Sequence, residues 1–242
     1  MAAVAAFVGL LIGTVGVGGV LMVSYLALFA GLPIHQAAAT SLFTFLFTGI
    51  LGTWLYQRRG SIDWKISIPV CAAALAFGFL GAALAAIVNP RPLAIIIALI
   101  IVGAGIYVLF PARPYTRVRD GRGRGETWLL AGVGAASGFG SGFSGAGGPL
   151  FSVPLMVILR YVPLTAVATS QVLQIVAATS GSLENYRNGF IDFEVALVVT
   201  IFELVGVIAG VRLAHAMSAL FLRRLAGALC MITGGLLLAR TL

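Results

Sequence analysis

Charged residues are scarce in this chain of 242 residues: aspartate, glutamate, lysine and arginine together account for 9% of it. A soluble domain carries about 25%, so a chain this poor in charge cannot cover a surface that faces water on all sides. Hydrophobic residues make up 60% of the sequence, and its mean hydropathy is +1.09. The composition predicts a multi-pass protein of a lipid bilayer, in which each helical span takes roughly 20 apolar residues.

Cysteine and histidine are also rare, with two residues of each. Cys71 and Cys230 lie in separate apolar runs without CxxC spacing, and His35 and His215 lack the spacing of metal ligands. The sequence therefore predicts no metal site, no disulfide framework and no cofactor. The GxSxG and HExxH motifs and the Walker lysine are missing as well. We expect no catalytic residues and no enzyme activity.

Acidic residues are few, and 15 basic against 7 acidic side chains give a net charge of +8. The basic residues stand between apolar blocks, chiefly at 58–65, 113–124 and 223–224. They form no basic stripe with interleaved aromatic residues, so nucleic acid is not an expected partner. Such positions are typical of loops at the cytoplasmic face of a membrane protein.

The apolar residues are grouped in eight blocks without the alternation of a strand, which predicts an all-α polytopic fold. One hydrophilic segment, a basic cytoplasmic linker at 111–126, separates two predicted transmembrane repeats, 1–110 and 127–242. The eight blocks are 3–30, 36–57, 66–88, 92–110, 127–159, 164–186, 194–215 and 220–241.

The two halves share sequence at a constant offset of 129 positions, without insertion or deletion. Short segments of the first half return in the second: 16–19 as 145–148, 39–41 as 168–170, and 60–63 as 189–192. Duplicated apolar segments interrupted by glycine are typical of secondary transporters, in which the interruptions point to the binding site.

The first block of each half is long and is cut in its middle by glycines. It forms either a long discontinuous helix or a re-entrant hairpin that enters the bilayer and returns. If all eight blocks cross, one face of the membrane collects 10 of the 15 basic residues; if 3–30 and 127–159 are re-entrant, it collects 12. The positive-inside rule favours the re-entrant arrangement. Each half then has three crossing helices, and the two repeats are inverted relative to each other.

The glycine interruptions are the first candidate binding site. Irregular backbone survives at membrane depth only where protein or water surrounds it, and a helix that restarts there points free N–H groups and its positive dipole end at an anion. Close helix packing is the alternative role for these small residues. The predicted anion-binding residues here are Gly16, Gly18, Gly19, Ser144, Gly145, Gly147 and Gly148.

Hydroxyl and amide side chains follow each interruption. Thr40 and Ser41 in the first half, with Thr169 and Ser170 in the second, can donate to an anion without burying a charge. Back-bonding to a carbonyl one turn earlier is the alternative. The second half adds the amides Gln171 and Gln174 where the first has Leu42 and Phe45, so we expect it to supply more of the specificity.

Glu203 lies in the middle of the apolar block 194–215. A carboxyl group at this depth is a candidate for proton coupling. The alternative is a carboxyl whose hydrogen bonds are satisfied within the helix bundle. Its counterpart in the first half is Ala74, so the duplication favours neither interpretation.

These motifs resemble the sulfite exporter TauE/SafE family: a GxGG element opening an apolar segment, an Ala-Thr-Ser stretch about twenty residues later, and then Gly-x-Ile-Asp, all present twice. The resemblance implies a permease of the bacterial or archaeal inner membrane that moves sulfite, sulfonates or related anions. The first copy departs from the second by having Val20 where the second has Pro149.

We therefore expect a secondary transporter for a small sulfur-containing oxyanion, exporting it by rocking one repeat against the other. An anion channel, a permease for another small carboxylate or inorganic anion, and a membrane-bound enzyme or assembly subunit are the alternatives. The expected partners are the anionic substrate and the lipid bilayer, with a homo-oligomer left open.

Overall fold

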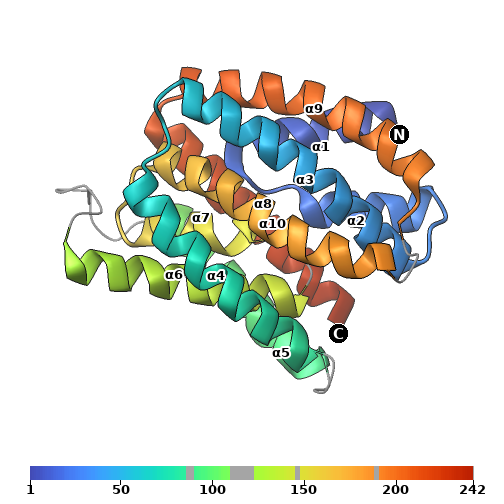
Figure 1. The fold of residues 1–242 in the computed structure, drawn as a ribbon, viewed down its shortest axis with the longest axis horizontal. Helices are drawn as coiled ribbons and strands as arrows, with labels where there is room; N and C mark the ends of the chain where they lie inside the picture. Colours follow the sequence, from blue (N-terminus) through green and yellow to red (C-terminus); the bar gives the residue numbers. More distant parts are fainter. Residues whose placement is uncertain (86–89, 110–122, 145–147, 188–190, 242) are drawn as a thin grey trace.

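The computed structural model describes residues 1–85, 90–109, 123–144, 148–187 and 191–241. These residues form ten α-helices and contain no strand (Figure 1). The helices are α1 (Ala2–Val15), α2 (Gly19–Phe29), α3 (Ile34–Arg58), α4 (Trp64–Ala85), α5 (Pro90–Leu109), α6 (Arg124–Ser144), α7 (Pro149–Ile158), α8 (Pro163–Arg187), α9 (Phe193–Ala216) and α10 (Ala219–Thr241).

The helices follow the predicted apolar blocks closely. Six blocks correspond to one helix each, whereas 3–30 divides into α1 and α2, and 127–159 into α6 and α7. The all-helical fold class is thus confirmed. Within the described ranges, four stretches are long and apolar enough to cross a bilayer: Gln36–Arg58, Trp64–Gly81, Phe193–Ala216 and Ala219–Leu236. Large apolar side chains such as Phe79 and Leu197 are exposed on these helices, as expected for surfaces that contact lipid.

Both broken elements double back on themselves. A Cβ atom on Gly18 would lie 3.1 Å from the carbonyl oxygen of Val8, although ten residues of continuous helix would separate them by about 15 Å. A Cβ atom on Gly140 would likewise lie 3.0 Å from the ring of Phe151 in α7. Since α2 and α7 have 11 and 10 residues, they span only about half of a ~30 Å hydrocarbon core. This geometry agrees with the re-entrant alternative.

Helices of the two halves pack against each other in reciprocal pairs. α1 packs on α9 and α6 on α4, so the first element of each half lies against the second crossing helix of the other half. A Cβ atom on Gly9 would lie 2.1 Å from the carbonyl oxygen of Glu203, and one on Gly138 would lie 2.3 Å from that of Ala74. Gly138 lies 129 positions after Gly9, and Glu203 lies 129 positions after Ala74, so the two contacts are equivalent in the two halves. Such exchange is typical of two copies related by a two-fold axis and is consistent with the predicted repeats.

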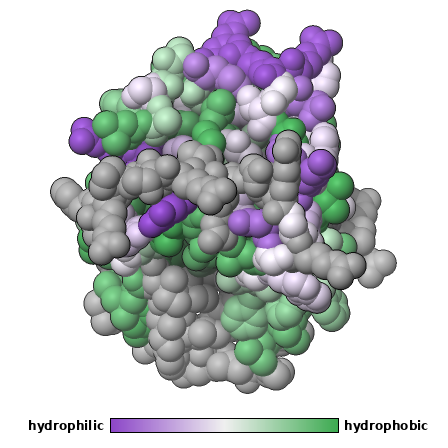
Figure 2. All heavy atoms as spheres, turned by 90° about the vertical axis from the view of Figure 1, so that its left-hand side faces the viewer, coloured by the Kyte–Doolittle hydropathy of each residue, from purple (hydrophilic) through white to green (hydrophobic). Residues whose placement is uncertain are grey.

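Hydrophilic and hydrophobic residues separate on the face drawn in Figure 2. Hydrophilic residues gather at its upper edge, and hydrophobic residues occupy much of the surface below. The basic end of α3, with Arg58 and Arg59 exposed, is one hydrophilic end of the bundle. A polar rim beside an apolar surface is the distribution expected of a protein whose sides contact lipid.

Candidate functional site

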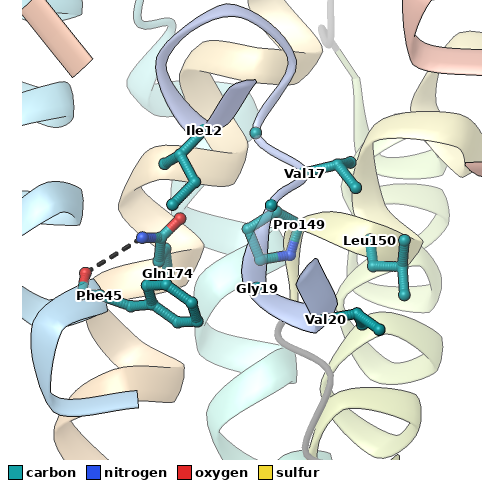
Figure 3. A pocket seen from close by; sticks show the side chains of 10 residues that line it. Ile12, Val17, Gly19, Val20, Phe45, Pro149, Leu150 and Gln174 are labelled. Carbon is teal, nitrogen blue, oxygen red and sulfur yellow. Dashed lines mark hydrogen bonds between the residues drawn. The ribbon is translucent and has the colours of Figure 1, made fainter. Parts of the chain in front are cut away.

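A small cavity lies where the two re-entrant elements meet. α2 begins at Gly19 and α7 at Pro149, so the N-terminal ends of both helices open into it. The cavity has a volume of about 20 Å³, room for about one water molecule. Gln174 and Phe45 lie on one side of it, with Val17 and Leu150 on the other (Figure 3). The lining comprises Ile12, Gly16, Val17, Gly18, Gly19, Val20, Phe45, Pro149, Leu150 and Gln174.

Gly16 is a residue that only glycine suits, for two reasons. First, its φ of 77° lies in the left-handed region. In this conformation Gly16 caps the end of α1, and its N–H donates to the carbonyl oxygen of Ile12. A Cβ atom here would also lie 2.4 Å from Oγ of Ser170 on α8. Ser170 in turn donates to the carbonyl of Val167 at 2.7 Å. The back-bonding that the sequence left open is therefore present, and the same hydroxyl touches the helix break.

The two predicted glutamines bridge helices. Nε2 of Gln174 donates to the carbonyl of Phe45 at 3.1 Å and to Oγ1 of Thr48 at 2.8 Å, both on α3. Nε2 of Gln171 donates to the carbonyl of Ile12 at 2.9 Å, in the last turn of α1. Both side chains are buried. Gln174 lines the cavity, whereas Gln171 supports the helix that leads into it.

The predicted threonines lie away from the cavity lining. Oγ1 of Thr40 accepts from the N–H of Asp192, just before α9, at 3.1 Å. Oγ1 of Thr169 lies 3.1 Å from Oγ of Ser67, in the first turn of α4. The two hydroxyls thus join equivalent places in the two halves. Thr40 holds the beginning of α9 against α3, and Thr169 holds the beginning of α4 against α8.

The remaining predicted residues differ in how far they are described. Ser41 is buried, and its hydroxyl has no hydrogen-bond partner among the described residues. Gly148 directly precedes α7 and leaves no room for a side chain, because a Cβ atom would lie 2.9 Å from Leu173. Gly145 and Gly147 lie outside the described residues, as does the side chain of Ser144.

Glu203 is fully buried at the contact of α9 with α1 and α3. No hydrogen bond reaches either carboxyl oxygen within the described part of the chain. The neighbouring polar side chain is Thr44, which donates its proton to the carbonyl of Ser41 at 2.9 Å. Arg212, nine residues on and so on the opposite side of α9, is exposed. Thr44 is thus the polar side chain that lies beside this carboxyl group, and both roles proposed from the sequence stay predictions.

Sequence reasoning missed Tyr56, which anchors the end of α1. Its hydroxyl donates to the carbonyl of Gly13 at 2.8 Å, and its buried ring lies 5.1 Å from that of His215 between centroids. His215 Nε2 lies 2.8 Å from Oγ of Ser61. An aromatic residue beside arginines at a helix end is typical of an interface anchor, so the sequence contained no signal of this buried role.

Comparison with known proteins agrees with a membrane transporter. The chain is 27% identical over 220 residues to the probable membrane transporter protein YdhB of Bacillus subtilis, covering 89% of each chain. It is 26% identical to the probable membrane transporter protein YunE of the same organism, over 79% of this chain and 80% of the other. A probable membrane transporter protein of Methanocaldococcus jannaschii is 25% identical, over 80% and 78%. No solved structure matches.

The family comparison covers almost the whole chain. The sequence profile described as sulfite exporter TauE/SafE matches residues 1–237, which include both re-entrant elements and all the residues discussed above. Together with the helical fold and the names of its relatives, this match makes the protein a multi-pass membrane permease and not an enzyme. The chain belongs to the sulfite exporter TauE/SafE family.

Proposed function

We propose that this permease is a secondary transporter that moves a small sulfur-containing oxyanion, such as sulfite or an organosulfonate, outward across the inner membrane. The anion binds in the cavity between the two re-entrant elements. Backbone N–H groups at the start of α2 and α7 donate to its oxygens. Gln174, whose two amide N–H groups donate to Phe45 and Thr48 in the contracted state, turns them to the anion when the elements separate. Ser41 and Ser170 lie on the helices that frame the cavity.

The observation that carries this proposal is the meeting of two helix beginnings at one buried cavity. Each N-terminus contributes about half a positive elementary charge. In the described part of α7 the free N–H group comes from Leu150, because Pro149 has none and those of Phe151 and Ser152 donate to the carbonyl of Gly148. No acidic side chain lines the cavity among the described residues. This arrangement therefore stabilises an anionic ligand.

The cavity is too small for a sulfonate, since its volume of about 20 Å³ admits about one water molecule. The described conformation is thus a contracted state of the site. Binding requires the re-entrant elements to separate, which is the motion that alternating access needs. Export follows the membrane potential, because a negative cell interior drives an anion outward by about 2.3 kcal/mol per charge for each 100 mV.

Transport by the purified protein in liposomes tests the proposal. Labelled sulfite, an alkanesulfonate, thiosulfate, sulfate and acetate are compared for saturable flux and for counterflow against unlabelled anion. Saturable sulfite or sulfonate flux with counterflow is the expected result. Flux without saturation or counterflow identifies an anion channel instead, and a preference for acetate identifies a permease for carboxylates.

The cavity itself is tested by charge. Gln174→Glu places a carboxylate in the lining and is expected to lower anion affinity at least tenfold, whereas Gln174→Met removes the donors without adding charge. Gln57→Glu makes the same change at the exposed end of α3 and should transport normally. Unchanged affinity in the Gln174→Glu protein contradicts the proposed site.

A further inference from the structure

Glu203 is a buried acid that the anion site does not use. Its side chain is 0% exposed, and neither carboxyl oxygen has a hydrogen-bond partner in the described ranges. One turn earlier on α9, the hydroxyl of Thr200 is also buried without a partner. These two groups and the neighbouring hydroxyl of Thr44 form a short polar strip inside the buried helix contact.

No charged group of the described helices compensates this carboxyl. α9 packs on α1 and α3, and α1 contains no titratable side chain. On α3, His35 and Arg58 belong to the first and last turns, and the Tyr56 hydroxyl donates to Gly13. On α9, Glu194, Arg212 and His215 lie toward the helix ends. An isolated ionised carboxylate is very costly in such surroundings, so the neutral acid is the form that this conformation accommodates.

The tight contact of α1 with α9 links this acid to the anion site. The Glu203 backbone touches Gly9, where a Cβ atom would lie 2.1 Å from the Glu203 carbonyl oxygen. Gly16, which lines the cavity, lies seven residues further along the chain, about 10 Å along the direction of α1. Ionisation of Glu203 requires water, which reaches the carboxyl group when α9 separates from α1 or from α3. Separation from α1 also moves the re-entrant element that carries the cavity.

We propose that Glu203 is the proton-binding site of this transporter: its carboxylate forms when the re-entrant elements separate, and it takes up a proton when an anion binds and the elements close around it. This inference rests on the proposed function. The proton comes from water at one face of the membrane, forms an O–H bond at a carboxyl oxygen, and leaves to water at the other face after the re-entrant elements have moved. Proton and anion therefore travel in the same direction, so the membrane potential still drives a doubly charged anion such as sulfite outward with one net negative charge, whereas a sulfonate crosses with none.

Electrostatics gives the sign and the size of this coupling. An anion in the cavity repels a carboxylate but not a carboxylic acid. Two unit charges roughly 10 Å apart at an effective dielectric constant of about 20 change each other's binding about tenfold. By linkage, protonation raises anion affinity by the same factor as the anion raises proton affinity.

Proton uptake on binding tests the inference without any transport. Ethanesulfonate is the probe because a sulfonate stays ionised at all working pH values, so any proton taken up belongs to the protein. The purified protein in weakly buffered detergent is mixed with ethanesulfonate while a pH dye is recorded. We expect alkalinisation of up to about half a proton per bound anion with the native protein, which is the most that a tenfold coupling allows, and none with Glu203→Gln. Glu194→Gln, an exposed acid in the first turn of α9, is the matched control and should behave as the native protein.

Three results decide the matter. Equal proton uptake by the Glu203→Gln and native proteins overturns the inference, as does anion binding to the native protein without proton uptake. Glu203→Ala introduces the residue found at the equivalent position 74 and replaces Glu203→Gln if the latter does not fold. If ethanesulfonate does not bind at all, the proposed binding of sulfonates fails. Infrared spectroscopy of the protein without anion then tests whether Glu203 binds a proton. A carbonyl band of a protonated acid that disappears on substitution of Glu203 retains the proton site, and its absence from the native protein overturns it.

Discussion

Substitution of Gly16 by alanine gives the sharpest test of the helix break, because two separate costs meet at this residue. Its φ of 77° is left-handed, where a residue with a Cβ atom loses roughly 1–2 kcal/mol. The new Cβ atom would lie 2.4 Å from Oγ of Ser170, and overpacking of this kind costs typically about 1–3 kcal/mol. We expect Gly16→Ala to lower the free energy of unfolding by about 2–5 kcal/mol.

Gly31 provides a matched control. Its φ is +70°, but a Cβ atom there would meet nothing within 4 Å, so Gly31→Ala carries only the backbone cost of about 1–2 kcal/mol. Ser170→Ala removes the clashing oxygen. The nearest remaining atom then lies 3.5 Å from a Cβ atom at position 16. The double variant should therefore recover about 1–3 kcal/mol relative to the sum of the single variants.

The free energies are measured by SDS titration of the protein in mixed micelles, followed by tryptophan fluorescence. Counterflow of the transported anion in liposomes gives the functional readout. We expect Gly16→Ala to lose counterflow and Gly31→Ala to keep it. If the two variants are equally destabilised, and Ser170→Ala restores nothing, the contact between the helix break and α8 does not exist as described.

Two further substitutions test the packing around the site. Gly138→Ala brings a Cβ atom within 2.3 Å of a backbone oxygen of α4 and should destabilise the protein by about 1–3 kcal/mol. Gly132→Ala is the control, because a Cβ atom there meets nothing within 4 Å, and it should be neutral or stabilising. Thermal unfolding compares the stability of the two variants. Tyr56→Phe removes the hydrogen bond to Gly13 and should cost about 1 kcal/mol, while the exposed Tyr107 tolerates the same change. A Tyr56→Phe protein as stable as the native one would show that this bond does not hold the end of α1.

The helices and their interruptions could be predicted from the sequence because both follow from local physics. Lipid requires long apolar stretches whose backbone bonds are satisfied within the helix. Glycines in the middle of 3–30 and 127–159 mark the places where this rule is broken. The distribution of arginine and lysine then favoured re-entrant elements, in agreement with the return of Gly18 to Val8.

The partners of the polar residues could not be predicted, because they depend on how helices approach one another. Thr40 and Ser41 are adjacent in the sequence, yet Thr40 binds the N–H of Asp192 and Ser41 has no partner among the described residues. Spacing within α3 does not indicate that α9 begins beside Thr40. The same holds for Tyr56, whose acceptor lies 43 positions away on α1.

The contact between Gln174 and Phe45 connects the duplication to specificity. These residues occupy equivalent positions, 129 apart, and the amide of one donates to the carbonyl of the other at 3.1 Å. Equivalent residues of two copies meet only where a two-fold axis passes between them, so α3 and α8 cross at the pseudo-symmetry axis of the predicted repeats. The cavity lies at this crossing. An anion at the proposed site would face an aromatic ring from one half and an amide from the other, although a symmetric ancestor would have offered it two identical sides. Because a ligand on the axis contacts both copies of any residue pair, divergence at this pair changes its surroundings more directly than divergence elsewhere.

We therefore expect exchange of the two side chains, Phe45→Gln with Gln174→Phe, to preserve anion selectivity better than either single substitution, as measured by competition in counterflow. Equal loss of selectivity in all three proteins would place the specificity away from the axis.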